Sequence, residues 1–154
     1  MRRFDVELLA DRLSCAAEWV ERLPEVRGLR GGYFGASTGA AAALIAAAAR
    51  PQRIGAVVSR GGRPDLAGPD VLARVQAPTL LLVGSRDRDV LELNRMAYEH
   101  LSCERKLQIV EGATHLFEEP GTLEQVAAHA RDWFLRFVPG GTGSRVSGQM
   151  MRNV

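Results

Sequence analysis

The sequence has little cysteine and almost no excess charge of either sign. Its two cysteines, Cys15 and Cys103, have no C-x-x-C spacing, which argues against a metal site or a redox pair and is typical of a reducing cytoplasm. Lysine and arginine number 20 against 18 aspartate and glutamate, for a formal net charge of +2. The basic residues are interspersed with carboxylates, so no basic stripe indicates a nucleic-acid partner.

Long hydrophobic runs are also missing. The start, Met1-Arg2-Arg3, leads into a charged amphipathic segment without the apolar region of a signal peptide. No apolar run approaches the roughly 20 residues of a transmembrane helix. We therefore expect a cytoplasmic protein without membrane contacts. Its length predicts one domain over residues 1–138, and the aperiodic tail 139–154, rich in glycine, serine and arginine, predicts disorder.

Residues 35–39, with the sequence G-A-S-T-G, fit the pattern G-x-S-x-G. The pattern is typical of a sharp strand-to-helix turn that holds a serine hydroxyl at its tip, so Ser37 is the candidate nucleophile. We expect both flanking glycines, Gly35 and Gly39, to be required because strand and helix nearly touch there, and the serine backbone to be strained. The alternative is a glycine-rich connection without chemistry.

Hydrophobic periodicity predicts an alternation of strands and helices. The predicted strands cover residues 31–36, 53–59, 78–83 and 106–110, and the predicted helices cover residues 5–23, 38–50, 67–75, 89–101 and the segment from 122 onward. The continuous apolar run at residues 80–83 indicates burial on both faces, as in a parallel sheet. The predicted fold class is therefore α/β, with a mostly parallel sheet of about four strands and helices on both faces.

Helix starts are expected at three capping residues. Asp5 is the expected N-cap of the first helix, while Asp89 with Glu92 and Thr122 with Gln125 have the spacing of capping boxes. The last helix is predicted to pack on the sheet through an apolar stripe. The stripe consists of Leu123, Val126, Ala127, Ala130, Phe134 and Phe137.

Reactive side chains follow the predicted strands, where open α/β sheets bind their ligands. These side chains are Ser37, Arg60, Asp87 and His115. Serine, aspartate and histidine in this chain order match the triad of α/β-hydrolases. We therefore predict that Ser37 attacks, that His115 acts as general base and then acid, and that Asp87 orients the imidazole.

Several residues compete for these roles. Asp89 lies near the same strand end as Asp87, although helix capping explains it. His100 near a helix end and His129 on a polar helix face are predicted to be structural or solvated. Arg60 is a candidate for binding an acidic group of a substrate, although an ion pair or a solvated arginine is the simpler interpretation. The glycine-rich turn lacks the lysine of a P-loop and the spacing of a dinucleotide fingerprint, so we expect no cofactor and no metal.

Three segments carry a family resemblance. They are residues 32–40 (GYFGASTGA), residues 59–67 (SRGGRPDLA) and residues 112–121 (GATHLFEEPG). Together they resemble the dienelactone-hydrolase-like α/β-hydrolases, especially a bacterial branch that is also found joined to phosphoribosyltransferase domains. The likeness covers roughly residues 4–138.

The resemblance implies that Ser37, Asp87 and His115 sit at the triad positions and that the substrate is a small ester or lactone. Dienelactone hydrolase itself has a cysteine nucleophile. A serine at this position therefore favours a general esterase reaction over lactone specificity.

The resemblance also implies strands before the first helix, one followed by a His-Gly-type loop that donates an N–H to the oxyanion hole. We expect an N-terminally truncated domain in which the Thr38 N–H is the first donor and the second has no source. Losing one such donor costs on the order of 10²–10³ in rate. The alternatives to a serine hydrolase are thus a non-catalytic interaction module or one part of a split protein, and the unpaired sheet edge predicts a homo-oligomer.

Overall fold

A computed structural model of the chain describes residues 3–138. Residues 1–2 and the tail 139–154, for which disorder was predicted, lie outside the described residues. The elements in chain order are α1 (Arg3–Glu21), a 3-10 helix (Pro24–Val26), β1 (Gly31–Ala36), α2 (Thr38–Ala49), β2 (Ile54–Arg60), a 3-10 helix (Pro64–Ala67), α3 (Pro69–Arg74), β3 (Thr79–Gly84), α4 (Arg88–His100), β4 (Arg105–Val110) and α5 (Thr122–Phe137).

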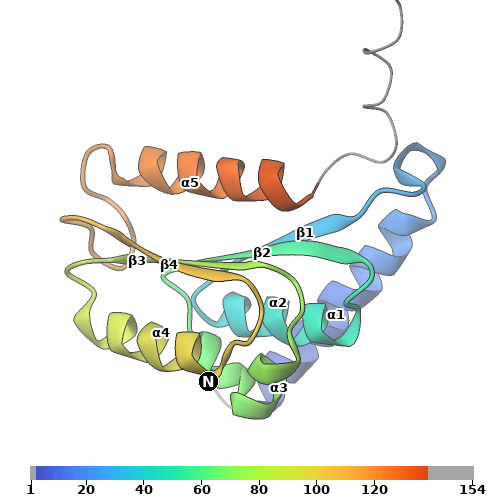
Figure 1. Cartoon of the computed structure of the whole chain (residues 1–154), viewed down its shortest axis with the longest axis horizontal. Helices are drawn as coiled ribbons and strands as arrows, with labels where there is room; N and C mark the ends of the chain where they lie inside the picture. The colour runs from blue at the N-terminus through green and yellow to red at the C-terminus, as the bar shows by residue number, and fades with distance from the viewer. Residues whose placement is uncertain (1–2, 139–154) are drawn as a thin grey trace, which may run out of the picture.

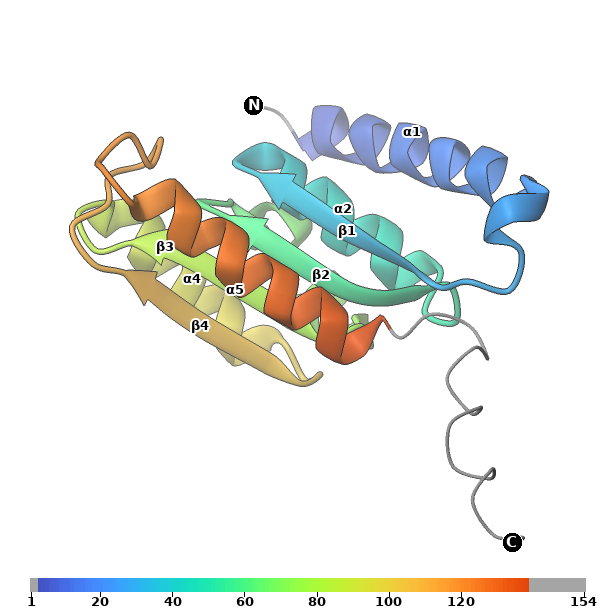
Figure 2. The same cartoon turned by 90° about the horizontal axis from the view of Figure 1, so that it is seen from above.

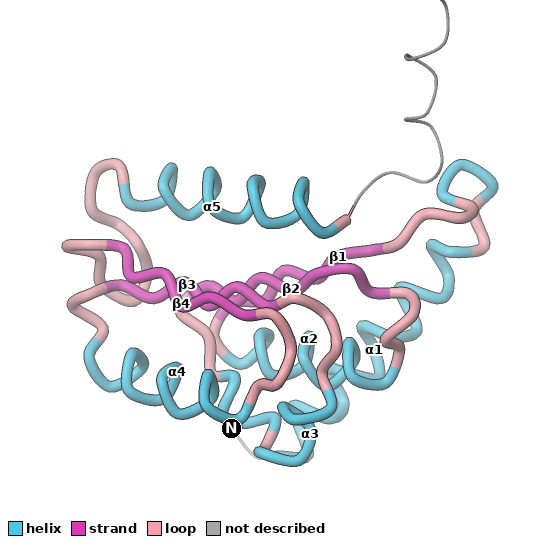
Figure 3. The backbone as a smooth tube through the Cα atoms, viewed as in Figure 1, coloured by secondary structure: helices cyan, strands magenta, loops and turns pink. Residues whose placement is uncertain are grey.

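The four strands form one parallel sheet in the order β1-β2-β3-β4. When strands are added in sequence order with the same hand of crossover, the connecting helices fall on one face. Helices α2, α3 and α4 accordingly lie on one side of the sheet, with α1 beside α2, and α5 alone covers the other side (Figures 1 and 3). The predicted α/β class, with four parallel strands and helices on both faces, is confirmed.

The sheet separates two hydrophobic cores. One core packs α1 to α4 against the sheet, and the other packs α5, which runs along the strands in Figure 2, against the opposite face. Successive residues of β3 alternate between the cores, since Leu81 belongs to the first and Leu80 and Leu82 to the second. All six residues of β3 are buried, which confirms the predicted burial on both faces.

The predicted caps of α1 and α4 are wrong. Helix α1 begins at Arg3, so Asp5 lies inside its first turn. Helix α4 begins at Arg88, and its N-cap is Asp87, whose side chain makes no capping hydrogen bond. Asp89 is in the first turn, where a carboxylate is favoured by the positive end of the helix dipole without closing a capping box.

Helix α5 begins at Thr122 as predicted, but its predicted N-cap is wrong and its packing face is confirmed only in part. Its N-cap is Gly121, with a φ of 80°. Thr122 does not cap the helix, because its hydroxyl donates a hydrogen bond to the preceding carbonyl of Glu119 (2.8 Å). Leu123 is 50% exposed, whereas Trp133 is buried and donates to the Pro78 carbonyl (3.1 Å). Val126, Ala130, Phe134 and Phe137 of the predicted stripe pack in the core on this face. The stripe is rotated away from Leu123 and Ala127 toward Trp133, whose indole N–H needs an acceptor when buried.

None of the helices within residues 3–138 is long and apolar enough to cross a membrane.

The central strand predicts a large difference between two leucine truncations. Leu81 is fully buried between the sheet and the helices, and Leu135 on α5 is 72% exposed. We expect Leu81→Ala to lower the free energy of unfolding by about 2–5 kcal/mol and Leu135→Ala to change it by no more than about 0.5 kcal/mol, as measured by urea denaturation. Equal losses for the two variants would contradict the assignment of Leu81 to the core.

Candidate active site

Ser37 occupies the single-residue turn between β1 and α2. Its backbone has a φ of 49° and a ψ of −125°, a sparsely populated positive-φ conformation that costs a non-glycine residue about 1–3 kcal/mol. The turn is held in place through the Ser37 carbonyl, which accepts hydrogen bonds from the backbone N–H groups of Ala40 (3.2 Å) and Arg63 (2.9 Å). The expected strain at the serine is therefore present, and the loop after β2 stabilises it.

Only one of the two flanking glycines is required by close packing. A Cβ at Gly35 would lie 2.6 Å from the Gly39 carbonyl oxygen and 2.7 Å from Ala40 Cα, so any side chain there would collide with the start of α2. A Cβ at Gly39 would meet nothing within 4 Å. The expectation holds for Gly35 and is wrong for Gly39, because Gly39 approaches the strand through its backbone and its Cα hydrogens face open space.

The structure brings Ser37, His115 and Asp87 into one hydrogen-bonded series. Ser37 Oγ lies 3.1 Å from His115 Nε2, and His115 Nδ1 lies 2.6 Å from Asp87 Oδ2. A carboxylate can only accept, so the Nδ1–H donates to Asp87 and Nε2 is left to accept the serine proton. The His115 side chain is 41% exposed and that of Asp87 only 14%. The imidazole is thus accessible from solvent while its carboxylate partner is shielded.

Backbone hydrogen bonds tie the turn that carries Asp87 to the loop that carries His115. The N–H of Ser85 donates to the Val110 carbonyl (3.0 Å), and the N–H of Arg86 donates to the Ala113 carbonyl (3.0 Å). In return, the Gly112 N–H donates to Ser85 Oγ (2.8 Å). The two segments follow the neighbouring strands β3 and β4. These hydrogen bonds therefore continue the pairing of the two strands past their ends and hold the segments that carry Asp87 and His115 side by side.

Thr38 lies next to Ser37 as the first residue of α2. Its backbone N–H therefore belongs to the first turn of the helix, whose N–H groups have no acceptor within the helix and lie at the positive end of the helix dipole. Thr38 was predicted to be an oxyanion donor, and an N–H of the first turn is a group of the required kind.

Arg60 ends β2, where it pairs with Ala36 of β1. Its guanidinium carbon is 5.7 Å from the ring centroid of Phe117, two residues after His115. The Arg60 Nε is buried without a hydrogen-bond partner among residues 3–138. Arg60 is thus placed against the loop of His115, on the other face of β2 from the neighbouring Ser59, which packs toward Ala40.

The competing residues lie outside this series of hydrogen bonds. Asp89 and His100 are exposed on α4, and His129 is half-buried on α5. Within the described part of the chain none of the three hydrogen-bonds to the Ser37, His115 and Asp87 side chains, and no group of histidine, cysteine and acidic residues is arranged to hold a metal ion.

Sequence reasoning missed a buried amide that braces the serine turn. Asn94 of α4 is fully buried, and its Nδ2 donates to the carbonyls of Gly62 (3.0 Å) and Val90 (2.8 Å). Gly62 precedes Arg63, the donor to the Ser37 carbonyl. One sequence signal could have identified Asn94. It follows Leu91 by three residues and so lies on the buried face of α4, where a polar side chain needs a hydrogen-bond partner.

Sequence reasoning also missed Glu119. Its carboxylate accepts hydrogen bonds from the backbone N–H and the hydroxyl of Thr114, the residue before His115. Hydrogen bonds from the Thr114 side chain are the main cause that lowers the pKa of the Glu119 carboxyl below its usual range. No motif links these two positions in the sequence.

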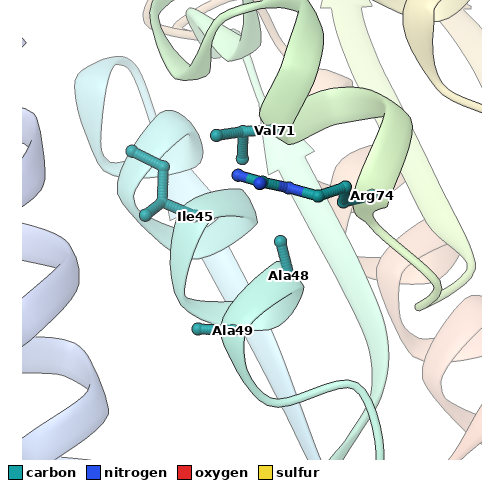
Figure 4. A pocket seen from close by; sticks show the side chains of 5 residues that line it. All are labelled: Ile45, Ala48, Ala49, Val71 and Arg74. Atoms are coloured by element: carbon teal, nitrogen blue, oxygen red, sulfur yellow. The ribbon is translucent and has the colours of Figure 1, made fainter.

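Two cavities lie away from Ser37, Asp87 and His115. One of about 340 Å³ lies between α2 and α3 and is lined by Ile45, Ala48, Ala49, Val71 and Arg74 (Figure 4). The other, of about 280 Å³, is lined by Gly32, Phe134, Leu135 and Val138. Neither of these two cavities is part of the candidate active site.

Comparison with known proteins identifies relatives at high identity. No protein-family model matches the chain. Two proteins from different strains of Mycobacterium tuberculosis, both named as phosphoribosyl transferases, are 58% identical over 142 residues. These residues make up 91% of the chain but only 32% of each relative, so the chain spans about a third of their length.

Solved structures show the same arrangement of strands and helices. The crystal structure of dienelactone hydrolase from Anabaena variabilis is 52% identical, with a TM-score of 0.85, over 88% of this chain and 62% of that one. A monoacylglycerol lipase from Paleococcus ferrophilus matches with a TM-score of 0.67 at 19% identity, over 83% of this chain and 74% of that one, and shows the shared fold alone.

The serine turn predicts opposite effects for its two glycines. Gly35→Ala places a methyl group against the backbone of α2, and we expect it to lower the free energy of unfolding by about 1–3 kcal/mol. Gly39→Ala adds a methyl group in open space within a helix, so we expect the free energy to be unchanged or raised by up to about 1 kcal/mol. Denaturant titration of both variants measures the difference. A Gly39→Ala variant as destabilised as Gly35→Ala would show that the packing at the turn is different.

Proposed function

Because the chain is 52% identical to a dienelactone hydrolase over 88% of its length, we propose that it is a serine hydrolase of the α/β-hydrolase type that cleaves a small carboxylic ester or lactone through an acyl-enzyme on Ser37. The observation that carries the proposal is the continuous series of hydrogen bonds from Ser37 Oγ through His115 to Asp87. The strained serine at the tip of a strand-to-helix turn supports it, since this conformation presents the hydroxyl to a substrate.

The proposed reaction uses each group in turn. Ser37 Oγ attacks the carbonyl carbon while its proton passes to His115 Nε2, and Asp87 stabilises the resulting imidazolium through Nδ1–H. The carbonyl oxygen becomes an oxyanion that accepts a hydrogen bond from the Thr38 N–H. When the tetrahedral intermediate collapses, the alkoxide leaving group takes the proton from His115. Water, deprotonated by His115, then attacks the acyl-serine. His115 returns the proton to Ser37 Oγ as the bond to the acyl carbon breaks, which releases the carboxylic acid and restores the free enzyme.

Arg60 is the candidate for contact with an acidic group of the substrate. Its buried Nε without a partner supports this role, and its stacking on Phe117 places it beside the loop of His115. A carboxylate-bearing ester would gain a charge-assisted hydrogen bond there.

The relatives carry two different names, dienelactone hydrolase and phosphoribosyl transferase. The matched region makes up 62% of the dienelactone hydrolase chain and only 32% of the mycobacterial proteins named as phosphoribosyl transferases. We therefore assign hydrolase chemistry to the matched third of those proteins and refer the transferase name to the remainder.

The proposed function predicts hydrolysis that depends on Ser37. We expect the protein to hydrolyse 4-nitrophenyl acetate and to react covalently with a fluorophosphonate probe, and we expect Ser37→Ala to abolish both, with a loss of roughly 10⁴-fold or more in kcat. Labelling of Ser37 no faster than in the denatured protein would overturn the proposal.

Two aspartates supply the matched control. Asp87→Asn removes the carboxylate that fixes the imidazole tautomer, so we expect kcat to fall by on the order of 10⁴. Asp89 lies two residues later, is exposed in the first turn of α4, and is outside the series of hydrogen bonds from Ser37 to Asp87. We therefore expect Asp89→Asn to leave kcat within about twofold. Equal effects of the two substitutions would contradict the role of Asp87.

A second candidate function is that of an interaction module, favoured by the edge of the sheet. Strand β1 pairs with β2 on one side only within the described residues. Phe34 in this strand is 51% exposed. A strand with an unpaired edge and an exposed aromatic ring is a surface that can pair with a second copy of the chain.

Self-association through this edge predicts a charge-sensitive contact. We expect sedimentation velocity to show a concentration-dependent dimer that Phe34→Lys weakens, because a lysine on an edge strand opposes strand pairing. Met96→Lys, at a 58% exposed position on α4, should leave the dimer unchanged. A monomer at all concentrations for the unsubstituted chain would exclude this contact.

A further inference from the structure

The segment that carries His115 has no regular secondary structure. Residues 111–121, the histidine loop, connect β4 to α5. The loop nevertheless holds the imidazole within hydrogen-bond distance of both Ser37 and Asp87. A side chain on an irregular loop keeps such a position only when the loop backbone is itself fixed by other groups.

Glu119 fixes the loop from the far side of His115. Both carboxylate oxygens lie 3.2 Å from the Thr114 backbone nitrogen, and Oε1 also accepts a hydrogen bond from the Thr114 hydroxyl. Thr114 directly precedes His115, and Glu119 follows it by four residues. The contact therefore closes the segment that bears the imidazole into a short ring.

The ring is anchored to a helix. The Glu119 carbonyl accepts hydrogen bonds from the hydroxyl (2.8 Å) and the backbone N–H (3.1 Å) of Thr122, a buried residue that begins α5. Inside the ring, the Phe117 N–H donates to the Thr114 carbonyl (3.2 Å), and Phe117 adopts a φ of 55° with its ring buried in the α5 core. The left-handed turn at Phe117 is thus sustained by contacts on both sides.

The chemistry of the contact favours an ionised carboxylate. Thr114 offers two donors, and its bonds are the main cause that keeps the pKa of the Glu119 carboxyl below its usual range. Hydrogen bonds to a charged acceptor are about twice as strong as those between neutral groups. Without Glu119, the Thr114 N–H would have to find water or remain unpaired, and the residue before the imidazole would be free to shift.

We propose that Glu119 is a positioning residue, which holds Thr114 and thereby sets His115 in line for proton transfer from Ser37. The inference rests on the proposed serine hydrolase function for its catalytic consequence. Its structural part, the placement of His115 against Asp87, stands independently of catalysis. Asp87 acts on the imidazole directly, whereas Glu119 acts through the backbone on the other side.

Three variants separate positioning from a general effect on folding. Glu119→Ala removes both acceptors. Glu119→Gln keeps one oxygen that can occupy the place of Oε1, the atom that accepts both bonds from Thr114. Glu118→Ala is the matched control, because Glu118 is the exposed neighbour on the same loop.

Two readouts are required. One is kcat and KM for 4-nitrophenyl acetate, and the other is the low-field proton NMR signal of the His115 Nδ1–H in its bond to Asp87. We expect Glu119→Ala to lower kcat by about 10- to 100-fold with KM little changed, since small misplacement of a catalytic group has an effect of this size. The same variant should broaden or abolish the low-field signal. Glu119→Gln should restore most of both readouts, and Glu118→Ala should match the unsubstituted protein.

Other outcomes would overturn the inference. An unchanged low-field signal in folded Glu119→Ala would show that His115 is positioned without Glu119, whatever happens to kcat. Equal losses in Glu119→Ala and Glu119→Gln that follow the melting temperature would assign Glu119 to folding alone. If the unsubstituted protein lacks esterase activity, the hydrolase proposal fails, and the NMR comparison still decides the positioning role.

Discussion

The close approach of β1 and α2 at Gly35 is the constraint on which the candidate active site depends. Gly35 has no Cβ, which would otherwise lie 2.6 Å from the Gly39 carbonyl oxygen, so strand and helix can approach this closely. The chain then turns from strand to helix within one residue, and Ser37 takes the positive-φ conformation that this turn demands. The position of Ser37 is thereby fixed, and the other two side chains of the site are brought to it. The turn after β3 brings Asp87, and the loop after β4 brings His115, to the same edge of a parallel sheet. The arrangement is a consequence of topology, since the carboxyl ends of parallel strands meet at one edge.

The strands and the reactive residues were predictable from the sequence because both follow strong local patterns. The apolar run at residues 80–83 has no other stable place than the middle of a sheet, and its position orders the strands around it. Ser37, Asp87 and His115 follow strand ends, so the topology alone places them near one another. The helix starts at Thr38 and Thr122 were predictable too, whereas the N-caps were not, because a glycine with positive φ at Gly121 permits an entry into α5 that the capping pattern does not anticipate.

The supporting residues were beyond sequence reasoning for a different reason. Asn94 and Glu119 act on backbone groups of loops, at Gly62 and Thr114, and such partners are decided by loop conformation rather than by residue periodicity. Trp133 was missed because the packing face of α5 is rotated by the need to satisfy its indole N–H at Pro78. In each case the observed side-chain position is the one in which a polar group finds its hydrogen-bond partner. Apolar spacing describes which face is buried, whereas it leaves open which hydrogen bonds the buried face must make.

The position of β1 in the sheet has a consequence for how the site responds to thermal motion. The strand that carries Ser37 is hydrogen-bonded on one side only within the described residues, whereas β3, which leads to Asp87, lies between two neighbours. Amide hydrogens of an edge strand exchange with solvent through local fraying, at a lower free energy than the opening of the central strands. Strand β4, which leads to His115, is the other edge of the described sheet, so of the three residues only Asp87 follows a strand with two neighbours. Fraying at either edge would therefore move Ser37 or His115 away from an Asp87 that stays in place.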